Sequence, residues 1–340
     1  MIPLCSNKNR NMTHFPVTST TLSATALGQF AIEKYNLSAN ATCQLFRTGI
    51  NHTYFITDDE HKYVLRVYCY NWRSKEEIQA EMDLLLLLKQ NNISVSYPIA
   101  DRNKQFIQDI NAPEGLRHAV LFSFAEGGKM RFMNEATCFK IGVLMGQLHQ
   151  ITVDKTCNRI AYNSESLVRK PYMQALQHFP TENPEMQYLK TVCNRISQTF
   201  ESIDHSMIAT GIIHLDIWYD NMNITEENQI TIFDFDFCGN GPLILDVAYF
   251  CKQLFHIENN KVEYESKKEQ FLKGYQSIRL LTVEELQLIP EAGAAIWIFY
   301  LGVQSQRFDW SNVFLTENYL KLMYVARLKS WLDYYNEFSN

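Results

Sequence analysis

The chain has 340 residues, of which 46% are hydrophobic and 20% charged, and its formal net charge is -6. This length predicts two domains with a sizeable core, and the negative charge argues against a nucleic-acid partner held through phosphate contacts. The start lacks the apolar core of a signal peptide, and no apolar run reaches the ~18 residues of a membrane span, so we expect a cytoplasmic protein without a membrane partner.

The first third of the chain has the pattern of an antiparallel sheet with one helix. After a polar segment, residues 1–17, which we expect to be a disordered tail with Met12 as an alternative start, short β-prone runs alternate with turn residues. These runs are residues 43–47, 53–57, 62–68, 94–98, 106–110 and 118–124. Ser74 is predicted to cap a helix with apolar residues at helical spacing up to Leu88. Residues 18–125 therefore predict an N-terminal lobe with a five-stranded sheet.

The rest of the chain is predicted to be mainly helical. Two adjacent glycines follow the last strand of the first lobe, so residues 126–128 form the predicted hinge. Helices are expected at residues 135–152, 184–203, 245–255, 264–278, 282–303 and 317–336, interrupted by one hairpin at 222–225 and 229–233. The fold class is therefore α+β, with a larger, mainly helical C-terminal lobe at residues 129–340.

Eight cysteines are scattered along the chain without a C-x-x-C pair. This spacing is typical of free or buried thiols in a reducing compartment. It argues against both a disulfide framework and a structural zinc site.

The second lobe contains an acidic stretch with the residue types of a phosphoryl-transfer site. Between Arg195 and Lys252 there are nine carboxylates and no lysine or arginine. Asp216 follows a hydrophobic segment and is expected to lie in a loop. There its carboxylate can face a substrate hydroxyl, which makes Asp216 the predicted catalytic base.

Three further side chains in this stretch predict a magnesium site. Asn221 follows Asp216 by five residues, and the hairpin then returns the chain to Asp234. If strand geometry continues beyond the hairpin, Asp234 and Asp236 project to the same face. Carboxylates beside a triphosphate require cations between them, so Asn221, Asp234 and Asp236 are predicted to hold Mg²⁺ bound to ATP.

His214 and Asp246 are predicted to support this site. His214 can hold the loop through backbone hydrogen bonds, and Asp246 is expected to be a buried brace beneath it. Any one of these acids alone would be an ordinary surface residue, but the whole set at these spacings rarely arises by chance. Only eleven residues separate Asp234 from Asp246, which leaves no room for the segment that holds a peptide substrate in protein kinases, so the predicted acceptor is a small molecule.

These motifs resemble the aminoglycoside phosphotransferase and choline kinase family, whose fold is similar to that of protein kinases and which includes a bacterial branch of homoserine kinases. The matching segments lie between about residue 43 and residue 250 and are residues 49–54, 63–67, 121–127, 142–149, 214–221, 232–236 and 245–248. The resemblance implies that Asn51, His52, Thr53 and Phe124 contact the nucleotide, that Arg66 contacts its phosphates, and that Glu81 pairs with Arg66.

Two residues depart from that family's usual pattern. Leu215 stands where glycine is usual, and Arg66 stands where lysine is usual. The planar fork of arginine could hold phosphate oxygens while pairing with Glu81. The alternative is an ion pair on the surface and a nucleotide-binding protein with weak or no catalysis. Because the predicted base and metal ligands are all present, we favour the enzyme.

The excess of acids and aromatic rings in the C-terminal lobe predicts an acceptor that carries an amine, such as an aminoglycoside or an amino alcohol. Most of these rings are expected to fill the core. The candidates for contact with the acceptor are Trp218, Tyr219, Asp309 and Trp310. Homoserine is the alternative acceptor. A metal-dependent hydrolase has less support, because the histidines lack the spacing of metal ligands.

Overall fold

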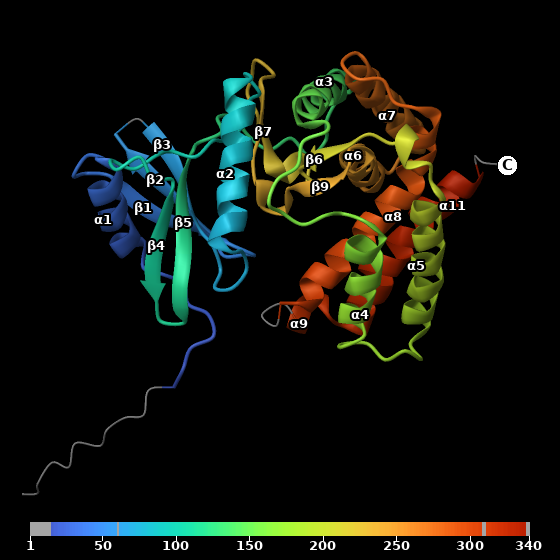
Figure 1. The fold of residues 1–340 in the computed structure, drawn as a ribbon, viewed down its shortest axis with the longest axis horizontal. Coiled ribbons are helices and arrows are strands. Elements are labelled where there is room, and N and C mark those ends of the chain that lie inside the picture. Colours follow the sequence, from blue (N-terminus) through green and yellow to red (C-terminus); the bar gives the residue numbers. More distant parts are fainter. Residues whose placement is uncertain (1–14, 60, 308–310, 338–340) are drawn as a thin grey trace, which may run out of the picture. The chain divides into compact units, whose positions relative to one another are not determined.

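The computed structural model describes residues 15–59, 61–307 and 311–337. The chain forms two compact units, which are described separately (Figure 1). The first contains the described residues up to Ile78 together with Pro98–Phe124, and the second contains Gln79–Tyr97 and the residues from Ala125 onward. The division after Phe124 lies beside the predicted hinge, whereas residues 79–97, which we placed in the first lobe, group with the second unit. Most of the predicted tail, Met12 included, lies outside the described residues.

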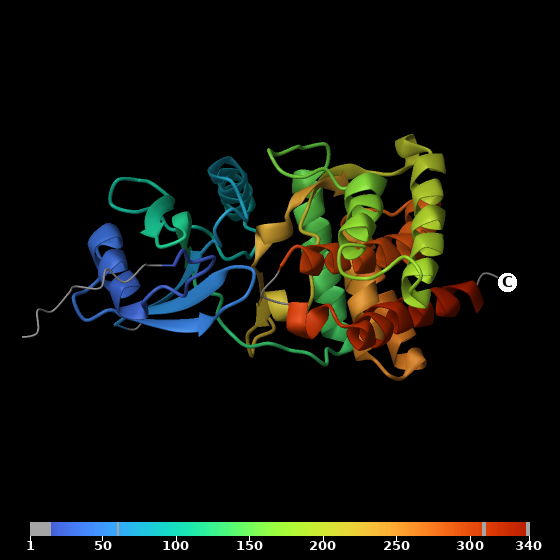
Figure 2. The same ribbon diagram turned by 90° about the horizontal axis from the view of Figure 1, so that it is seen from below.

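The first unit is an antiparallel sheet with one helix on a face (Figures 1 and 2). Its strands are β1 Thr42–Arg47, β2 His52–Asp58, β3 His61–Val67, β4 Ile107–Ala112 and β5 Gly115–Ser123, in the order β1-β2-β3-β5-β4. Helix α1 spans Ala24–Tyr35, and α2, Lys75–Gln90, begins in this unit. The five predicted strands of the sheet are confirmed to within three residues at each end.

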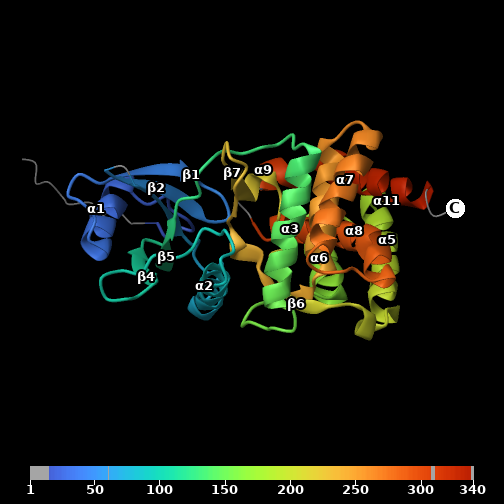
Figure 3. The same ribbon diagram turned by 90° about the horizontal axis from the view of Figure 1, so that it is seen from above.

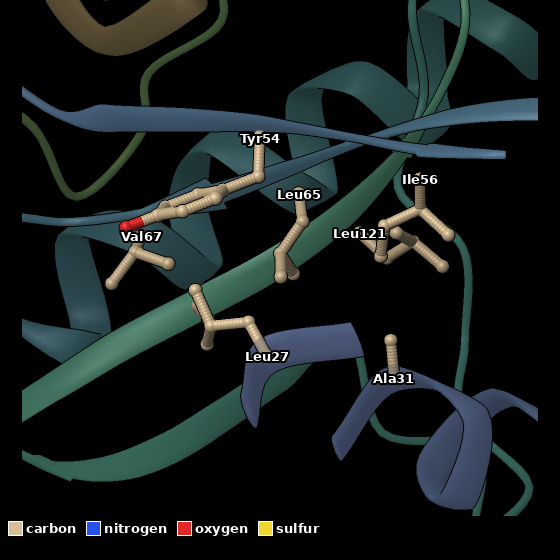
Figure 4. Packing of buried hydrophobic residues seen from close by; sticks show 8 residues of the cluster. Leu27, Ala31, Tyr54, Ile56, Leu65, Val67 and Leu121 are labelled. Carbon is tan, nitrogen blue, oxygen red and sulfur yellow. The ribbon is translucent and has the colours of Figure 1, made fainter. Parts of the chain in front are cut away.

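The core of the first unit lies between α1 and the sheet (Figure 4). Leu27 and Ala31, one helical turn apart, face Tyr54, Leu65 and Leu121 of three adjacent strands, and all five are at most 4% exposed. The alternation of buried and exposed residues along β2 turns one side of that strand toward the helix. Sequence periodicity did not predict α1, because its apolar stripe is only two turns long.

The second unit is mainly helical (Figure 3). Its longer helices are α3 Glu135–Thr152, α5 Pro184–Ser202, α6 Ile244–Ile257, α7 Lys261–Gln276, α8 Val283–Ser305 and α11 Ala326–Glu337. Its short helical segments are η1 Glu165–Arg169, α4 Lys170–Ala175, η2 His205–Met207, η3 Tyr219–Asn221, η4 Phe235–Phe237, α9 Ser311–Phe314, α10 Glu317–Tyr319 and η6 Leu320–Val325. Two small sheets pair β6 Thr210–Ile213 with β9 Gly239–Pro242, and β7 Met222–Ile224 with β8 Ile230–Ile232.

Three expectations about local structure were wrong. Residues 94–98 form no strand, because Val95 and Pro98 each make only an isolated bridge, to Ile232 and to Phe122. The predicted single helix at residues 317–336 is divided into α10, the π-helical η6 and α11. The strands β6 and β9 were not predicted, since each is short and pairs with a segment far away in the sequence.

Helix α8 has the length and apolar composition of a membrane span, but 67% of its most apolar window is buried inside the protein. It is the central helix of the second unit and packs against α6, α4 and α5. This burial is typical of an apolar helix in the core of a protein. The cysteines within the described residues are free, as expected.

Close packing of α3 on α7 depends on glycine. A Cβ atom at Gly142 would lie 2.0 Å from the backbone oxygen of Phe271 and 2.7 Å from the backbone nitrogen of Tyr275. A Cβ atom at Gly274 would likewise lie 2.0 Å from the backbone oxygen of Phe139. Backbone atoms cannot turn aside as a flexible side chain can, so a larger residue must separate the two helices.

Replacing Gly142 by alanine is expected to lower the free energy of unfolding by about 3 kcal/mol, although alanine is the better helix former. Urea denaturation would measure this loss. Gly128→Ala is the matched control, because a Cβ atom there would meet nothing within 4 Å. Equal stability of the two variants would contradict the close packing of these helices.

Candidate active site

The segment after β6 places the predicted catalytic residues in a tight loop. Strand β6 ends at Ile213, and His214, Leu215 and Asp216 follow it directly. Leu215 has a φ of 61°, in the left-handed region, and its side chain is fully buried. This backbone conformation turns the chain so that Asp216 leaves the strand direction.

Asp246, near the start of α6, holds this loop in place. Its Oδ2 accepts hydrogen bonds from the backbone N–H of His214 at 2.8 Å and from Nε2 of His149 at 3.0 Å, and its Oδ1 accepts one from the N–H of Leu215 at 2.6 Å. Burial opposes ionisation of this fully buried carboxyl most strongly, but these hydrogen bonds and the nearby histidines keep the pKa of Asp246 below its ordinary value. Asp246 is therefore an ionised brace beneath the loop.

His214 connects the loop to the segment that follows β8 and contains Asp234. Its Nδ1 accepts a hydrogen bond from the N–H of Asp216 at 3.1 Å, so the ring proton is on Nε2, which donates to the backbone oxygen of Phe233 at 3.2 Å. Complete burial lowers the pKa of His214, although the charge of Asp246 opposes this. A neutral His214 therefore fixes the backbone on both sides of the site.

The Asp216 carboxylate lies among three neighbouring side chains. Its Oδ1 accepts a short hydrogen bond from the hydroxyl of Tyr249, and its Oδ2 accepts one from Nδ2 of Asn221 at 2.6 Å. The hydroxyl of Tyr300 lies close enough to lower the pKa of Asp216 and donates to the adjacent backbone oxygen of Leu215 at 3.2 Å. Burial raises the pKa of Asp216 to about 7, against the hydrogen bond from Tyr249, and the nearby charge of Asp234 raises it further. A carboxylate with this pKa can accept a proton near neutral pH.

Asn221 and Asp234 lie beside each other because the β7–β8 hairpin pairs the residues between them. The backbone oxygen of Asn221 accepts a hydrogen bond from the N–H of Phe233 at 3.0 Å. Nδ2 of Asn221 donates both to the backbone oxygen of Asp216, at 3.0 Å, and to its carboxylate, so the amide must turn its Oδ1 away from Asp216. This orientation leaves the oxygen of the amide, rather than its nitrogen, facing away from the base.

The side-chain oxygens of Asn221 and Asp234 fit a magnesium ion that also binds substrate phosphates. Among the described residues, no three His, Cys, Asp or Glu side chains converge as metal ligands. A divalent cation at this site would therefore draw on the Asn221 amide, the Asp234 carboxylate and phosphate oxygens. Mg²⁺ is commonly held by one or two carboxylates together with phosphates, so the residues present suit it.

Asp236 does not project beside Asp234 as strand geometry would require. Strand β8 ends at Ile232, Asp234 has a φ of 65°, and the chain turns there into the 3-10 helix η4. Asp236 is 2% exposed, and its backbone oxygen accepts a short hydrogen bond from the buried guanidinium of Arg159. The expected continuation of the strand was wrong, and a metal-binding role of Asp236 stays a prediction.

Both the sequence and the fold have known relatives. Residues 42–281 match the family described as the phosphotransferase enzyme family. The chain belongs to that family. The phosphotransferase is 28% identical over 306 residues to an uncharacterised protein of Synechocystis sp., covering 88% of this chain and 83% of that protein. It is 22% identical over 263 residues to a homoserine kinase of Neisseria meningitidis, covering 77% and 82% of the two chains.

Two solved structures have the same fold as the phosphotransferase. A microcompartment-associated aminopropanol kinase has a TM-score of 0.75 and 20% identity, covering 92% of this chain and 97% of that chain. An amicoumacin kinase in complex with AMP-PNP, Ca²⁺ and its antibiotic has a TM-score of 0.74 and 20% identity, covering 91% and 92%. The predicted family and fold class are confirmed, and the protein is a small-molecule phosphotransferase.

The predicted nucleotide residues of the phosphotransferase lie in the first unit. Oδ1 of Asn51 accepts a hydrogen bond from the backbone N–H of Cys69 at 3.2 Å. This bond joins the β1–β2 loop to the segment after β3. His52 and Thr53 begin β2, and the Phe124 ring stacks edge-on to Phe55 with 5.8 Å between centroids. Their contacts with a nucleotide stay a prediction.

Arg66 and Glu81 belong to different units. The guanidinium carbon of Arg66 lies 5.1 Å from the ring centroid of Phe122. Glu81 is fully buried in the second unit. Burial by itself lowers the pKa of Arg159, but nearby charges, that of Glu81 among them, outweigh burial and raise it. The predicted pairing of Arg66 with Glu81 stays a prediction.

Of the predicted acceptor contacts, Trp218 and Tyr219 lie in the catalytic loop of the phosphotransferase. Both are half-buried, and their ring centroids are 4.8 Å apart. Asp309 and Trp310 lie outside the described residues. Contact with an acceptor stays a prediction for all four.

Sequence reasoning missed the residues around Asp216 that come from helices. Tyr249 follows Asp246 by three residues and therefore lies on the same face of α6, a spacing that could have indicated it. Tyr300, on α8, was recognised only as one of several aromatic residues. Arg159 gave no signal, because it lies in an irregular segment and donates mainly to backbone oxygens of η4 and its neighbours.

Leu215 shows how the phosphotransferase accepts a side chain in a left-handed conformation. Leu215→Ala is expected to lower the free energy of unfolding by about 3 kcal/mol, because a buried leucine is lost while the strain at positive φ remains. Leu215→Gly removes that strain, so it should be no less stable than Leu215→Ala in urea denaturation. At Ile213, buried in β6, glycine should instead be about 1 kcal/mol worse than alanine. If the glycine variant were less stable than the alanine variant at both positions, the result would contradict backbone strain at Leu215.

Proposed function

We propose that the protein transfers the γ-phosphate of ATP, bound with Mg²⁺, to a hydroxyl group of a small molecule that carries an amine. One observation carries the proposal: the Asp216 carboxylate, the Asn221 amide and the Asp234 carboxylate are held close together by the loop, the hairpin and Asp246. Phosphoryl transfer needs a base for the hydroxyl and oxygen ligands for the cation at one place. We expect the enzyme in the cytoplasm, where ATP is available and thiols stay free.

In the proposed reaction, Asp216 orients the acceptor hydroxyl and takes its proton. The hydroxyl oxygen forms a bond to the γ-phosphorus as the bond from that phosphorus to the bridging oxygen breaks, and ADP leaves with the electron pair of the broken bond. Bound Mg²⁺ would supply neutralisation of the charge on the phosphate oxygens. The contribution of the protein is positioning, because the hydrogen bonds from Tyr249 and Asn221 leave the Asp216 carboxylate little freedom to rotate.

The amine on the acceptor is supported by the chemistry of the catalytic loop and by the relatives. Trp218 and Tyr219 present aromatic rings near Asp220, and ammonium groups bind well beside both rings and carboxylates. The aminopropanol kinase and the homoserine kinase are named for acceptors that carry an amine. Homoserine is accordingly the second candidate acceptor.

ADP release measured across aminoglycosides, amino alcohols, choline, homoserine and uncharged sugars tests the proposal. Turnover of at least one amine-bearing alcohol is expected, and turnover of uncharged sugars alone would contradict the amine. A rise in melting temperature with ATP and Mg²⁺, with no acceptor phosphorylated, would favour a nucleotide-binding protein without catalysis.

A further inference from the structure

Lys252 is a buried lysine close to the catalytic base. It lies on α6, two turns beyond Asp246, and is 1% exposed. Its ammonium nitrogen lies 4.1 Å from the ring centroid of Trp297, 4.6 Å from that of Tyr249 and 6.0 Å from that of Tyr300. Within the described residues it meets three ring faces and no hydrogen-bond acceptor.

The groups around Lys252 add nitrogen atoms and positive charge. Nε1 of Trp297 and Nε2 of His256 are both buried and have no hydrogen-bond partner among the residues that the structure describes. The His256 and Trp297 rings lie 5.0 Å apart, and the guanidinium of Arg327 lies 6.0 Å from the indole. The Lys252 ammonium, the His256 imidazole and the Arg327 guanidinium therefore all lie close to the Trp297 indole.

This arrangement is unfavourable unless an anion completes it. Cation–π contacts offset only part of the free energy needed to bury an ammonium group. Each buried N–H without an acceptor is an additional destabilising contribution. Burial lowers the pKa of Lys252 to about 7, although the charge of Asp216 opposes this and Arg327 lowers it further. Among the residues that the structure describes, Asp216 is the carboxylate that affects the pKa of Lys252, and it is already hydrogen-bonded to Tyr249 and Asn221.

The cluster is joined to the catalytic base through two tyrosines. Tyr249 donates to Asp216, Tyr300 donates to the adjacent backbone oxygen of Leu215, and both rings lie close to the ammonium of Lys252. A molecule whose hydroxyl meets Asp216 could therefore extend past these rings toward the ammonium. Trp297 and Tyr300 are three residues apart on α8, so the indole and the second tyrosine lie on one helix face.

We infer that Lys252 and the indole N–H of Trp297 form a binding site for a carboxylate of the acceptor. The inference rests on the proposed function and deepens it, because an acceptor that carries both an amine and a carboxylate is a hydroxylated amino acid. One oxygen of a carboxylate would accept from the ammonium and neutralise it, and the other would give the indole N–H an acceptor. His256 and Arg327 lie beside the same indole ring.

Three compounds separate the contributions of amine and carboxylate. Homoserine carries both groups, 3-aminopropan-1-ol is the same skeleton without the carboxylate, and 4-hydroxybutyrate lacks the amine. Isothermal titration calorimetry of the full chain at pH 6.5 should show tighter binding of homoserine than of 3-aminopropan-1-ol by at least tenfold. Lys252→Met should weaken homoserine and 4-hydroxybutyrate by about thirtyfold or more and leave 3-aminopropan-1-ol within threefold. Lys190→Met, an exposed lysine on α5, is the matched control and should change neither.

Several outcomes would overturn the inference. Equal weakening of homoserine and 3-aminopropan-1-ol by Lys252→Met would show that the lysine only positions Asp216. A failure of both carboxylates to bind the wild-type protein would also reject the site. Turnover of carboxylate-free amino alcohols alone would keep the proposed function and overturn this inference. Carboxylate binding that depends on Lys252, without turnover of any acceptor, would support the inference and contradict the proposed function.

A pH series tests the charge of Lys252 without altering it. The groups that face Lys252 are Asp216, Tyr249, Tyr300, His256 and Arg327. Asp216→Asn protein removes the one acidic group that could titrate in the same range, and 4-hydroxybutyrate itself does not titrate there. In this variant the pKa of Lys252 lies below its wild-type value of about 7, because the charge of Asp216 that raises it is gone. Affinity for 4-hydroxybutyrate should therefore fall by about tenfold per pH unit as pH rises above that lowered pKa, because the ammonium loses its proton. Affinity that stays constant up to pH 9 would contradict a charged Lys252 in the site.

Discussion

Asp216→Asn is expected to lower kcat at least a thousandfold while leaving the Kd of ATP within about threefold. The change removes the proton acceptor but keeps the size of the side chain. Asn221 and Tyr249 donate to different oxygens of Asp216. An amide in this position can keep its oxygen toward Asn221 and turn its NH2 group toward Tyr249, whose hydroxyl can reverse and accept. The loop should therefore keep its shape.

ADP release and calorimetric titration with a nonhydrolysable ATP analogue would measure the two quantities separately. Glu226→Gln is the matched control, because it removes an exposed carboxylate from the same acidic stretch and should keep at least half of the turnover. Activity of Asp216→Asn close to that of the wild type would show that another group accepts the proton.

Asp246→Ala is expected to lower the free energy of unfolding by about 3–5 kcal/mol and to abolish turnover. The alanine leaves the backbone N–H groups of His214 and Leu215 and the imidazole of His149 buried without their acceptor. Urea denaturation measures the loss, and faster hydrogen exchange of the His214 and Leu215 amides would locate it in the catalytic loop. Asp333→Ala, which removes an exposed carboxylate of α11, should change stability by less than 0.5 kcal/mol.

The stabilisation by Asp246 depends on pH in a defined direction. The pKa of Asp246 in the folded protein lies below the ordinary value of 3.8, so its contribution is complete above that value and is lost as pH falls through the lower, folded pKa. The difference in stability between the wild type and Asp246→Ala should therefore shrink on strong acidification. A difference that persisted unchanged at pH 2 would mean that the carboxylate is not ionised in the folded protein.

Local structure was predicted best where one segment contains the whole signal. Helix α3 was predicted with its exact bounds, because its apolar residues recur over eighteen residues between clear boundaries. The sequence did not predict strand β6 or the isolated bridge of Val95, because each pairs with a segment distant in the sequence. The turn at Asp234 was missed because φ and ψ at a single acidic residue redirect the chain without changing the hydrophobic pattern.

The sequence by itself determined which residue types the proposed site contains. Asp216, Asn221 and Asp234 lie within nineteen residues, and their spacing and residue types already require a base and oxygen ligands on one loop and hairpin. Tertiary structure alone decided what surrounds the base. Tyr249, Lys252 and Tyr300 reach it from α6 and α8, because the packing of these helices depends on contacts spread over the whole second unit. No short motif encodes such contacts, so the surroundings of Asp216 became visible only in the folded chain.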